Sequence, residues 1–122
     1  MEEDLRSRLM LALPGVPVEW GWSGQGAVLP RVVLQIISDV TDYTHDGPSG
    51  YKQNRVQIDI YANSFKTCID KMRLLDAALS GLRAGVILGA FKAGRRDYAP
   101  DISAGETLGR ISVDYMIHHI EE

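Results

Sequence analysis

The hydrophobic residues of the chain follow two different periods, and the first period is that of a helix. Leu5, Leu9 and Leu13 recur at every fourth position behind an acidic first turn. This spacing places them on one face of a helix, and negative charge suits a helix N-terminus. Pro14 directly follows the last of them, so the pattern predicts a short helix that ends there.

A longer helix is predicted in the middle of the chain. Apolar side chains recur at helical spacing from residue 65 to residue 82, Asn63 or Ser64 can serve as N-cap, and Gly81 or Gly85 marks the stop. Its predicted apolar stripe consists of Phe65, Cys68, Ile69, Met72, Leu75, Leu79 and Leu82.

The remaining apolar segments have the alternating period of strands. Residues 31–38 are β-branched and apolar at nearly every position, whereas residues 55–61 and 109–120 alternate apolar and polar side chains. A further short strand is predicted at 86–92, and residues 14–30 are predicted to be a loop with a brief extended piece.

This order of elements predicts the fold class. Helix, two strands, helix and two strands, without repeats, indicate one α+β domain over residues 1–122, with a mostly antiparallel sheet of about four strands and two helices packed on one face. The predicted core comprises Leu34, Ile36, Val56, Ile58, Ile60, Phe65, Ile69, Met72, Leu75, Leu79, Ile111, Val113 and Tyr115. The opposite face is predicted to carry Gln35, Gln57, Asp59, Tyr61, Ser112, Asp114 and Met116.

A polar, glycine-rich stretch lies between the first two strands. Asp46-Gly47 and Ser49-Gly50 supply turn residues, and Pro48 fixes one backbone dihedral. We predict that residues 39–53 form a long β-hairpin that projects from the domain, with its tip at 45–50. An isolated two-stranded hairpin is marginally stable in water, so a partner is expected to order it; the competing interpretation is a mobile surface loop without a role.

Composition and charge narrow the functional classes. With a formal net charge of -3, the chain lacks the cationic field that attracts nucleic acid phosphates or anionic lipid. The single Cys68 and the acidic start after Met1 suggest a reducing cytoplasm without secretion, and no apolar run is long enough to cross a membrane.

Candidate chemistry is weak throughout. The serine motifs at 21–25 and 47–51 each miss the final glycine of a nucleophile elbow. His118 and His119 are adjacent on a predicted strand, so they point to opposite faces and do not suit a single metal. We therefore predict no enzymatic activity, no metal and no cofactor.

One basic pair leaves a nucleic-acid alternative open. Arg95 and Arg96 lie beside Tyr98, an arrangement that can clamp phosphate and stack a base. Asp97 and Asp101 flank them, however, so a local ion-pair cluster in a loop is the preferred interpretation.

Taken together, the residues resemble a known family. The resemblance rests on the short N-terminal helix, the strand at 29–38, the turn Tyr43-Thr-His-Asp-Gly-Pro-Ser-Gly50, the strand Val56-Gln-Ile-Asp-Ile-Tyr-Ala62 and the stretch Arg95-Arg-Asp-Tyr-Ala-Pro-Asp101. In these parts the chain resembles the tail-completion, or tail-terminator (head-tail joining), proteins of long-tailed phages and prophages. The D-G-P-S-G turn and the following V-Q-I-D-I-Y strand are the most specific parts. Residues 99–109 depart from the family in being longer than its usual short link.

The resemblance implies a structural virion protein, assembled in the cytoplasm of a bacterial host and located in the virion tail. It implies a homo-oligomeric, hexameric ring that terminates the tail tube and joins it to the head connector or head-completion protein, while DNA passes through the lumen without specific binding. No membrane is involved. The alternatives are a cytoplasmic interaction module unrelated to phage and a weak nucleic-acid binder. The residues expected at interfaces are Tyr43, His45, Asp46, Tyr51, Asp59, Tyr61, Arg95, Arg96, Tyr98, Asp114 and Met116.

Overall fold

In the residues that it describes, the computed structural model has two helices and five strands. It describes residues 1–21, 30–103 and 106–120, without the side chains of residue 48 and of residues 98–108. The elements are α1 (Glu2–Ala12), β1 (Val18–Trp20), β2 (Arg31–Thr44), β3 (Gly47–Ala62), α2 (Phe65–Leu79), β4 (Ile87–Ser103) and β5 (Glu106–Ile120).

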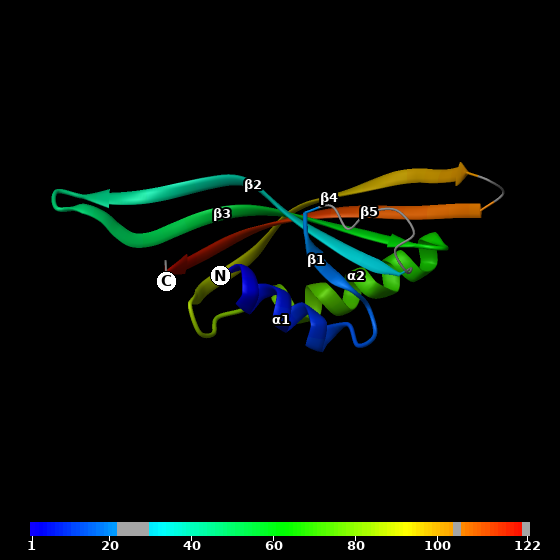
Figure 1. Ribbon diagram of the computed structural model, residues 1–122, viewed down its shortest axis with the longest axis horizontal. Helices are drawn as coiled ribbons and strands as arrows, with labels where there is room; N and C mark the ends of the chain where they lie inside the picture. Colours follow the sequence, from blue (N-terminus) through cyan, green and yellow to red (C-terminus); the bar gives the residue numbers. More distant parts are fainter. Residues whose placement is uncertain (22–29, 104–105, 121–122) are drawn as a thin grey trace.

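All five strands belong to one sheet in the order β1-β2-β3-β5-β4 (Figure 1). The pairs β2/β3, β3/β5 and β5/β4 are antiparallel, as the element order predicted. The short β1 adds a fifth strand that pairs parallel with β2 from Val32 to Leu34. The sheet is therefore mostly antiparallel, as predicted, with one parallel pair, and it has one strand more than the expected number of about four.

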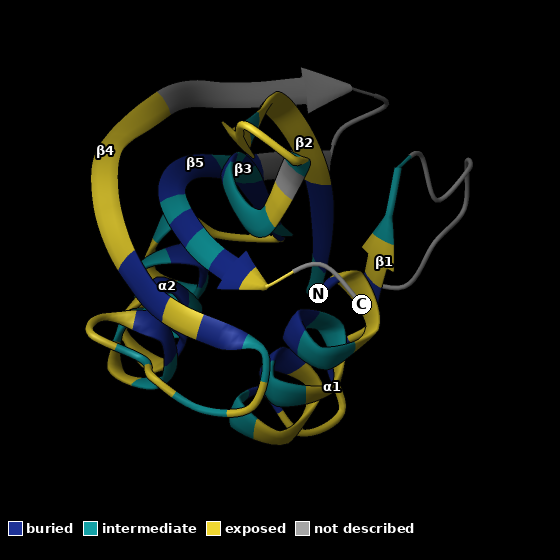
Figure 2. Cartoon of the chain, turned by 90° about the vertical axis from the view of Figure 1, so that its left-hand side faces the viewer, coloured by how far each residue is buried: buried dark blue, intermediate teal, exposed yellow. Residues whose placement is uncertain are grey.

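Both helices lie on the same side of the sheet (Figures 1 and 2). The sheet curls, with β4 and β2 at the two sides of the curl and β5 and β3 between them (Figure 2). Leu5, Leu9 and Leu13 are fully buried in the same hydrophobic cluster as Leu75 and Leu79. The two apolar stripes read from the sequence thus meet one face of the sheet and form one core.

The start of α2 is fixed by a cap and by close backbone packing. Ser64 is the N-cap, and its hydroxyl accepts a hydrogen bond from the Thr67 amide at 3.2 Å. A Cβ on Gly109 of β5 would lie 3.1 Å from the Ser64 carbonyl carbon. Glycine at this position therefore lets the first turn of α2 approach the sheet closely. The helix ends at Leu79, shortly before Gly81, whose φ of +75° suits glycine.

Most of the predicted core is buried, with one error. Ten of the thirteen predicted residues are buried, and Phe65 and Ile69 are partly buried against the cluster. The prediction that Ile36 belongs to the core is wrong, because 40% of its surface is exposed. It pairs with buried Val56, but it lines a pocket that the helices leave unfilled. Buried residues outside the prediction are Met1, Leu5, Leu9, Leu13, Val16, Val18, Val32, Val33, Ala62, Cys68, Ile87, Ala90 and Ile117.

The strand predicted at 86–92 is much longer in the structure. β4 runs from Ile87 to Ser103 and pairs with β5 down to Ser103 and Glu106. Register shifts after Ile87, after Lys92 and after Tyr98 interrupt the alternation along it. The expected loop at 95–101, and most of the expected long link at 99–109, is therefore a β-hairpin, because bulges break the period by which strands are recognised.

The predicted projecting hairpin is present and is formed by β2 and β3 (Figure 1). Thr44 pairs with Gly47, so His45 and Asp46 form the tip, which is shorter than the expected 45–50. β3 pairs with β5 only from Tyr51 onward. Residues 42–50 therefore extend beyond the rest of the sheet, and we call this segment the arm.

Candidate assembly interface

The sheet face without helices carries an ionic network across three strands. Its centre is Asp114 of β5, a carboxylate with only 2% of its surface exposed. Arg55 of β3 donates to Oδ2 through Nε at 3.1 Å and through Nη2 at 2.9 Å. From β4, Arg96 donates through Nη2 to Oδ1 at 3.1 Å. Two guanidinium groups from neighbouring strands thus neutralise one buried charge.

A second carboxylate continues this network along the same face. Asp59, with 3% of its surface exposed, accepts hydrogen bonds from Arg110 at 3.2 Å, from Gln57 at 3.1 Å and from the Ser112 hydroxyl. The Arg110 guanidinium also lies 5.5 Å from the centroid of the Tyr61 ring. Four residues predicted on this face, Gln57, Asp59, Ser112 and Asp114, therefore lie together inside one network.

This network gives a structural role to Asp59 and Asp114, the two carboxylates predicted to line a subunit contact or a lumen. Asp59 and Asp114 are bound by residues of their own chain, so they stabilise the sheet face itself. The exposed layer above them consists of the arginine side chains Arg55 and Arg96, with side-chain exposures of 40% and 48%. Whether this face meets a second subunit stays a prediction.

We predict that Asp114→Ala lowers the free energy of unfolding by about 1 to 3 kcal/mol, because it removes the shared acceptor of two charged donors. The two arginines are partly exposed and can turn to water, which limits the loss. Asp97→Ala is the matched control, since Asp97 forms an exposed pair with Arg95 at 2.6 Å, and such pairs contribute about 1 kcal/mol or less. Equal urea midpoints for the two variants would contradict the central role of Asp114.

Near the base of the arm the same face becomes apolar. The Tyr51 hydroxyl and His118 Nδ1 share a hydrogen bond, and the Phe91 ring meets the His118 ring edge-on at 5.6 Å between centroids. Phe91 pairs with Met116 and is 56% exposed, and Ile120 beside them is 48% exposed. Tyr51 and Met116 were predicted at interfaces. Phe91 was not predicted at an interface. The register shift that follows Ile87 breaks the alternation of the strand, so the sequence does not reveal on which face Phe91 lies.

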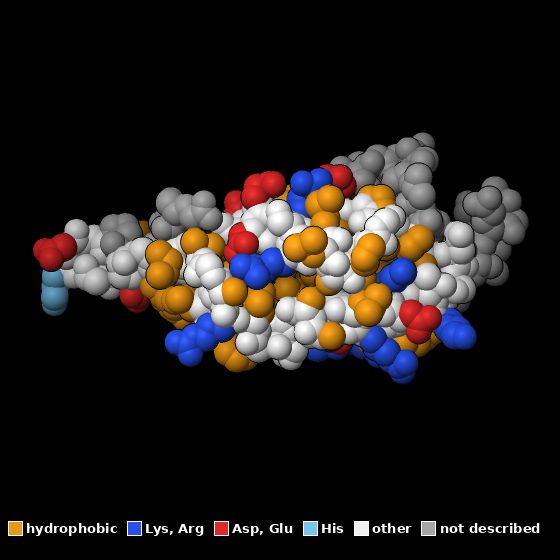
Figure 3. All heavy atoms as spheres, turned by 90° about the horizontal axis from the view of Figure 1, so that it is seen from below, with side chains coloured by type: hydrophobic (Ala, Val, Ile, Leu, Met, Phe, Trp, Pro, Cys, Tyr) orange, Lys and Arg blue, Asp and Glu red, His pale blue; other side chains and the backbone are white. Residues whose placement is uncertain are grey.

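The arm presents the other predicted interface residues to solvent. Tyr43 is 69% exposed, and His45 and Asp46 form the tip, where the space-filling view shows histidine and acidic side chains (Figure 3). The hydrogen bonds of the arm are local. The Thr44 hydroxyl donates to the Gly47 carbonyl at 3.0 Å, and the Ser49 hydroxyl donates to Asp42 at 2.8 Å.

The predicted basic pair is divided between two environments. Arg95 donates through Nε and Nη2 to Asp97, which agrees with the preferred interpretation of a local ion pair, but both residues lie in β4 and not in a loop. Arg96 instead joins the Asp114 network and also donates to Gln57 at 3.3 Å. The side chain of Tyr98 lies outside the described part of the structure. The arginines are thus already engaged by carboxylates of their own chain.

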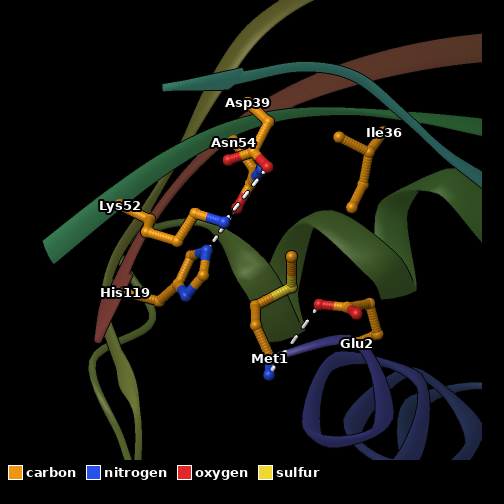
Figure 4. A pocket seen from close by; sticks show the side chains of 7 residues that line it. All are labelled: Met1, Glu2, Ile36, Asp39, Lys52, Asn54 and His119. Carbon is orange, nitrogen blue, oxygen red and sulfur yellow. Dashed lines mark hydrogen bonds and ion pairs between the residues drawn. The ribbon is translucent and has the colours of Figure 1, made fainter. Parts of the chain in front are cut away.

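A pocket of about 310 Å³ lies between the N-terminus of α1 and the base of the arm (Figure 4). On one side Lys52 donates to Asp39 at 3.1 Å, which holds the pKa of Asp39 below its usual value. Across from them, the ring of buried His119 donates from Nε2 to the Asn54 side-chain oxygen. Its Nδ1 has no hydrogen-bond partner among the described residues. The lining residues are Met1, Glu2, Ile36, Asp39, Lys52, Asn54 and His119.

His119 is predicted to make stability depend on pH. Burial lowers the pKa of this imidazole below 6.5, so the folded protein favours the neutral ring more than the unfolded chain does. The resulting stabilisation is present above pH 6.5 and is lost as the pH falls below it. We expect the urea midpoint to drop between pH 7 and pH 5, and to drop less in His119→Gln. His45→Gln, at the exposed tip, is the control for the loss of an imidazole outside the pocket.

Two other ionisable groups are buried in the core and have perturbed pKa values. Burial raises the pKa of the Cys68 thiol, which lies 3.6 Å from the Ile60 carbonyl oxygen. The pKa of Tyr115 is raised by burial and by its hydrogen bond to Asp76. Both groups are therefore held in their neutral forms, which suits a packing role.

The part of the chain that the structure describes contains no group of three or more His, Cys, Asp or Glu residues arranged to hold a metal ion. In the same residues, no helix is long and apolar enough to span a membrane.

Comparison with known proteins bears on the fold of the chain. No protein-family model and no curated protein matches the chain. Among solved structures, the chain is similar to a chain of the virion of a native gene transfer agent particle, with a TM-score of 0.64 and 14% sequence identity. The similarity covers 92% of this chain and 84% of that one. The chain thus shares its fold with a component of a virion particle.

Proposed function

We propose that the protein is a structural subunit of a phage-type virion, without catalytic function. In this proposal it forms a ring, hexameric by the family resemblance, at the head-proximal end of the tail tube. The ring stops tube polymerisation and joins the tail to the head connector or head-completion protein. It assembles in the bacterial cytoplasm and becomes part of the virion tail.

The observation that carries this proposal is the shared fold with a chain of the gene transfer agent virion, which extends over 92% of the present chain. The turn and strand at 46–61, which resemble tail-completion proteins, form the arm and the central strand of the structure. A solvent-exposed arm with only local hydrogen bonds suits a subunit whose contacts are made with other copies or with the tube.

Specific DNA binding is the weaker candidate. Arg95 and Arg96 are the exposed basic pair, and their carboxylate partners Asp97 and Asp114 would compete with phosphate for the same N–H donors. We propose that DNA passes through the ring without a specific contact. Weak, sequence-independent binding that disappears at 0.2 M salt would agree with this, whereas a sequence preference would favour the alternative.

The test is deletion of the gene from the genome that encodes it, followed by electron microscopy of the particles. We expect tails of uncontrolled length without heads, and heads without tails, because the tube lacks its terminating ring. Expression of the intact chain from a plasmid should restore normal particles. Normal particles in the deletion strain would overturn the proposed function and favour an interaction module unrelated to phage assembly.

A further inference from the structure

The described part of the sheet ends in two strand edges that pair with no other described strand. On one side, β1 covers β2 only as far as Leu34, and residues 35–44 continue without a neighbour on that side among the residues that the structure describes. On the other side, the Gly81 amide, between α2 and β4, donates to the Ala90 carbonyl at 2.9 Å. Beyond this contact, residues 91–97 of β4 form the outer edge of the sheet, and no other described strand pairs with that edge. Unpaired edges with free N–H and C=O groups are templates for strand addition.

Both edges carry exposed apolar side chains. On β2 the exposed fractions are 46% for Ile37, 57% for Val40 and 69% for Tyr43, and on β4 Phe91 is 56% exposed. Natural edge strands are commonly protected by lysine, by proline or by a covering element. Here the apolar residues remain open on both sides of one molecule.

The charges of the two edges are opposite. Residues 35–46 contain Asp39, Asp42 and Asp46 and no lysine or arginine. Residues 91–97 contain Lys92, Arg95 and Arg96 against a single Asp97. Lys92 pairs with Asp76 of α2 at 2.8 Å and Arg96 pairs with Asp114, so Arg95 is the basic residue of this edge whose carboxylate partner lies on the edge itself. Asp97 accepts from Nε and Nη2 of Arg95, and a guanidinium has five N–H donors, so Arg95 retains donors for a second carboxylate.

We propose that β2 of one copy adds to β4 of a second copy, so that neighbouring subunits share a continuous sheet. This inference rests on the proposed ring and names the surface that builds it. The two edges are different surfaces of the same chain, and such head-to-tail contacts generate rings when the rotation closes. The partner is therefore a second copy of this chain.

The strand directions fit this contact. Because β2/β3, β3/β5 and β5/β4 are all antiparallel, β2 and β4 run in opposite directions within one subunit. Rotation about an axis along the strands preserves these directions, so β4 of one copy meets β2 of the next in an antiparallel pair. The register shifts after Ile36 and after Lys92 give each edge a local twist, which restricts pairing to an edge of matching shape.

The test exchanges the charges of the two edges. In the first variant, Asp42→Lys with Asp46→Lys makes the β2 edge basic. In the second, Lys92→Glu with Arg95→Glu makes the β4 edge acidic. Because Lys92 pairs with Asp76 of α2 at 2.8 Å, the thermal midpoint of this variant is compared with that of Lys92→Gln, which removes the same pair without adding a negative charge. Each variant alone should associate about 100-fold more weakly than the wild type, because like charges then face each other. An equimolar mixture should regain wild-type association, because each subunit meets only complementary neighbours. The variant Asp70→Lys with Arg83→Glu, two exposed residues outside the sheet, is the control.

Association is measured by sedimentation and electron microscopy, and strand pairing by hydrogen exchange. In the assembled wild type we expect slower amide exchange at 35–44 and 91–97 than in the monomer. Rings formed equally well by both charge variants alone would overturn the edge contact and leave the proposed ring function standing. Rescue in the mixture without amide protection would also overturn it, since side chains alone would then account for the contact. Wild-type protein that stays monomeric at all concentrations, and also on isolated tail tubes, would overturn both proposals.

Discussion

Replacing Asp42–Tyr51 by Asn-Gly is expected to abolish ring formation while the thermal midpoint of the protein stays nearly unchanged. The new two-residue turn would follow Thr41 and precede Lys52, which are paired in β2 and β3. Asn-Gly is the sequence that favours a tight hairpin turn. The sheet and its core therefore remain intact while the arm is removed.

The small effect on stability follows from the contacts of the arm. Tyr43 is 69% exposed, and the side-chain hydrogen bonds that the structure shows for residues 42–49 join residues of the arm or its base. Tyr51 is the exception, because its hydroxyl bonds to His118 and its backbone lies opposite Ile120. The deletion also removes Tyr51, which lies at the base of the arm and contacts the sheet. Tyr51→Ala is therefore the matched control, because it measures how much of the shift in thermal midpoint comes from the loss of Tyr51 alone.

In particles, the arm deletion should give tails of uncontrolled length, as the loss of the whole protein would. Thermal unfolding, sedimentation and electron microscopy of particles measure the three effects. Normal tails and a normal particle yield would reject a role for the arm and favour the plain surface loop. A midpoint that falls by far more than in Tyr51→Ala would show that the segment belongs to the folded core.

Leu75→Ala is expected to lower the free energy of unfolding by about 2 to 5 kcal/mol. Leu75 is fully buried on α2, in the cluster that joins both helices to the sheet. Truncation removes apolar contacts and leaves a cavity that the surrounding side chains only partly fill. Leu74→Ala is the matched control on the same helix, because 47% of Leu74 is exposed.

Urea unfolding of the two variants measures this difference. Leu74→Ala should change the free energy of unfolding by about 0.5 kcal/mol at most, as surface substitutions usually do. Since Leu75→Ala acts on the core and leaves the arm intact, any folded fraction should still assemble. Similar midpoints for both variants would mean that the buried face of α2 is assigned wrongly.

The sequence by itself determined the helices, their buried faces and the central strands. Leu5, Leu9 and Leu13 had to share one helix face, and Val56, Ile58 and Ile60 one sheet face, because these positions follow from the helical and strand periods alone. The hairpin could also be predicted, since its turn residues act locally. Ser64 was one of two possible caps, and only the structure distinguished it from Asn63.

Other features depended on contacts between distant segments, and these only the tertiary structure decided. β1 is three residues long, too short for a periodic pattern, and it is a strand because β2 offers it an edge. β4 extends to Ser103 because β5 pairs with it across bulges that the alternation does not reveal. Asp59 and Asp114 were placed on the correct face, but their burial depends on arginines up to 59 positions away in the sequence. The local period of the sequence determines on which face of a helix or strand a side chain lies. Its partners depend on which strands lie side by side in the sheet, and this is decided by contacts between distant segments.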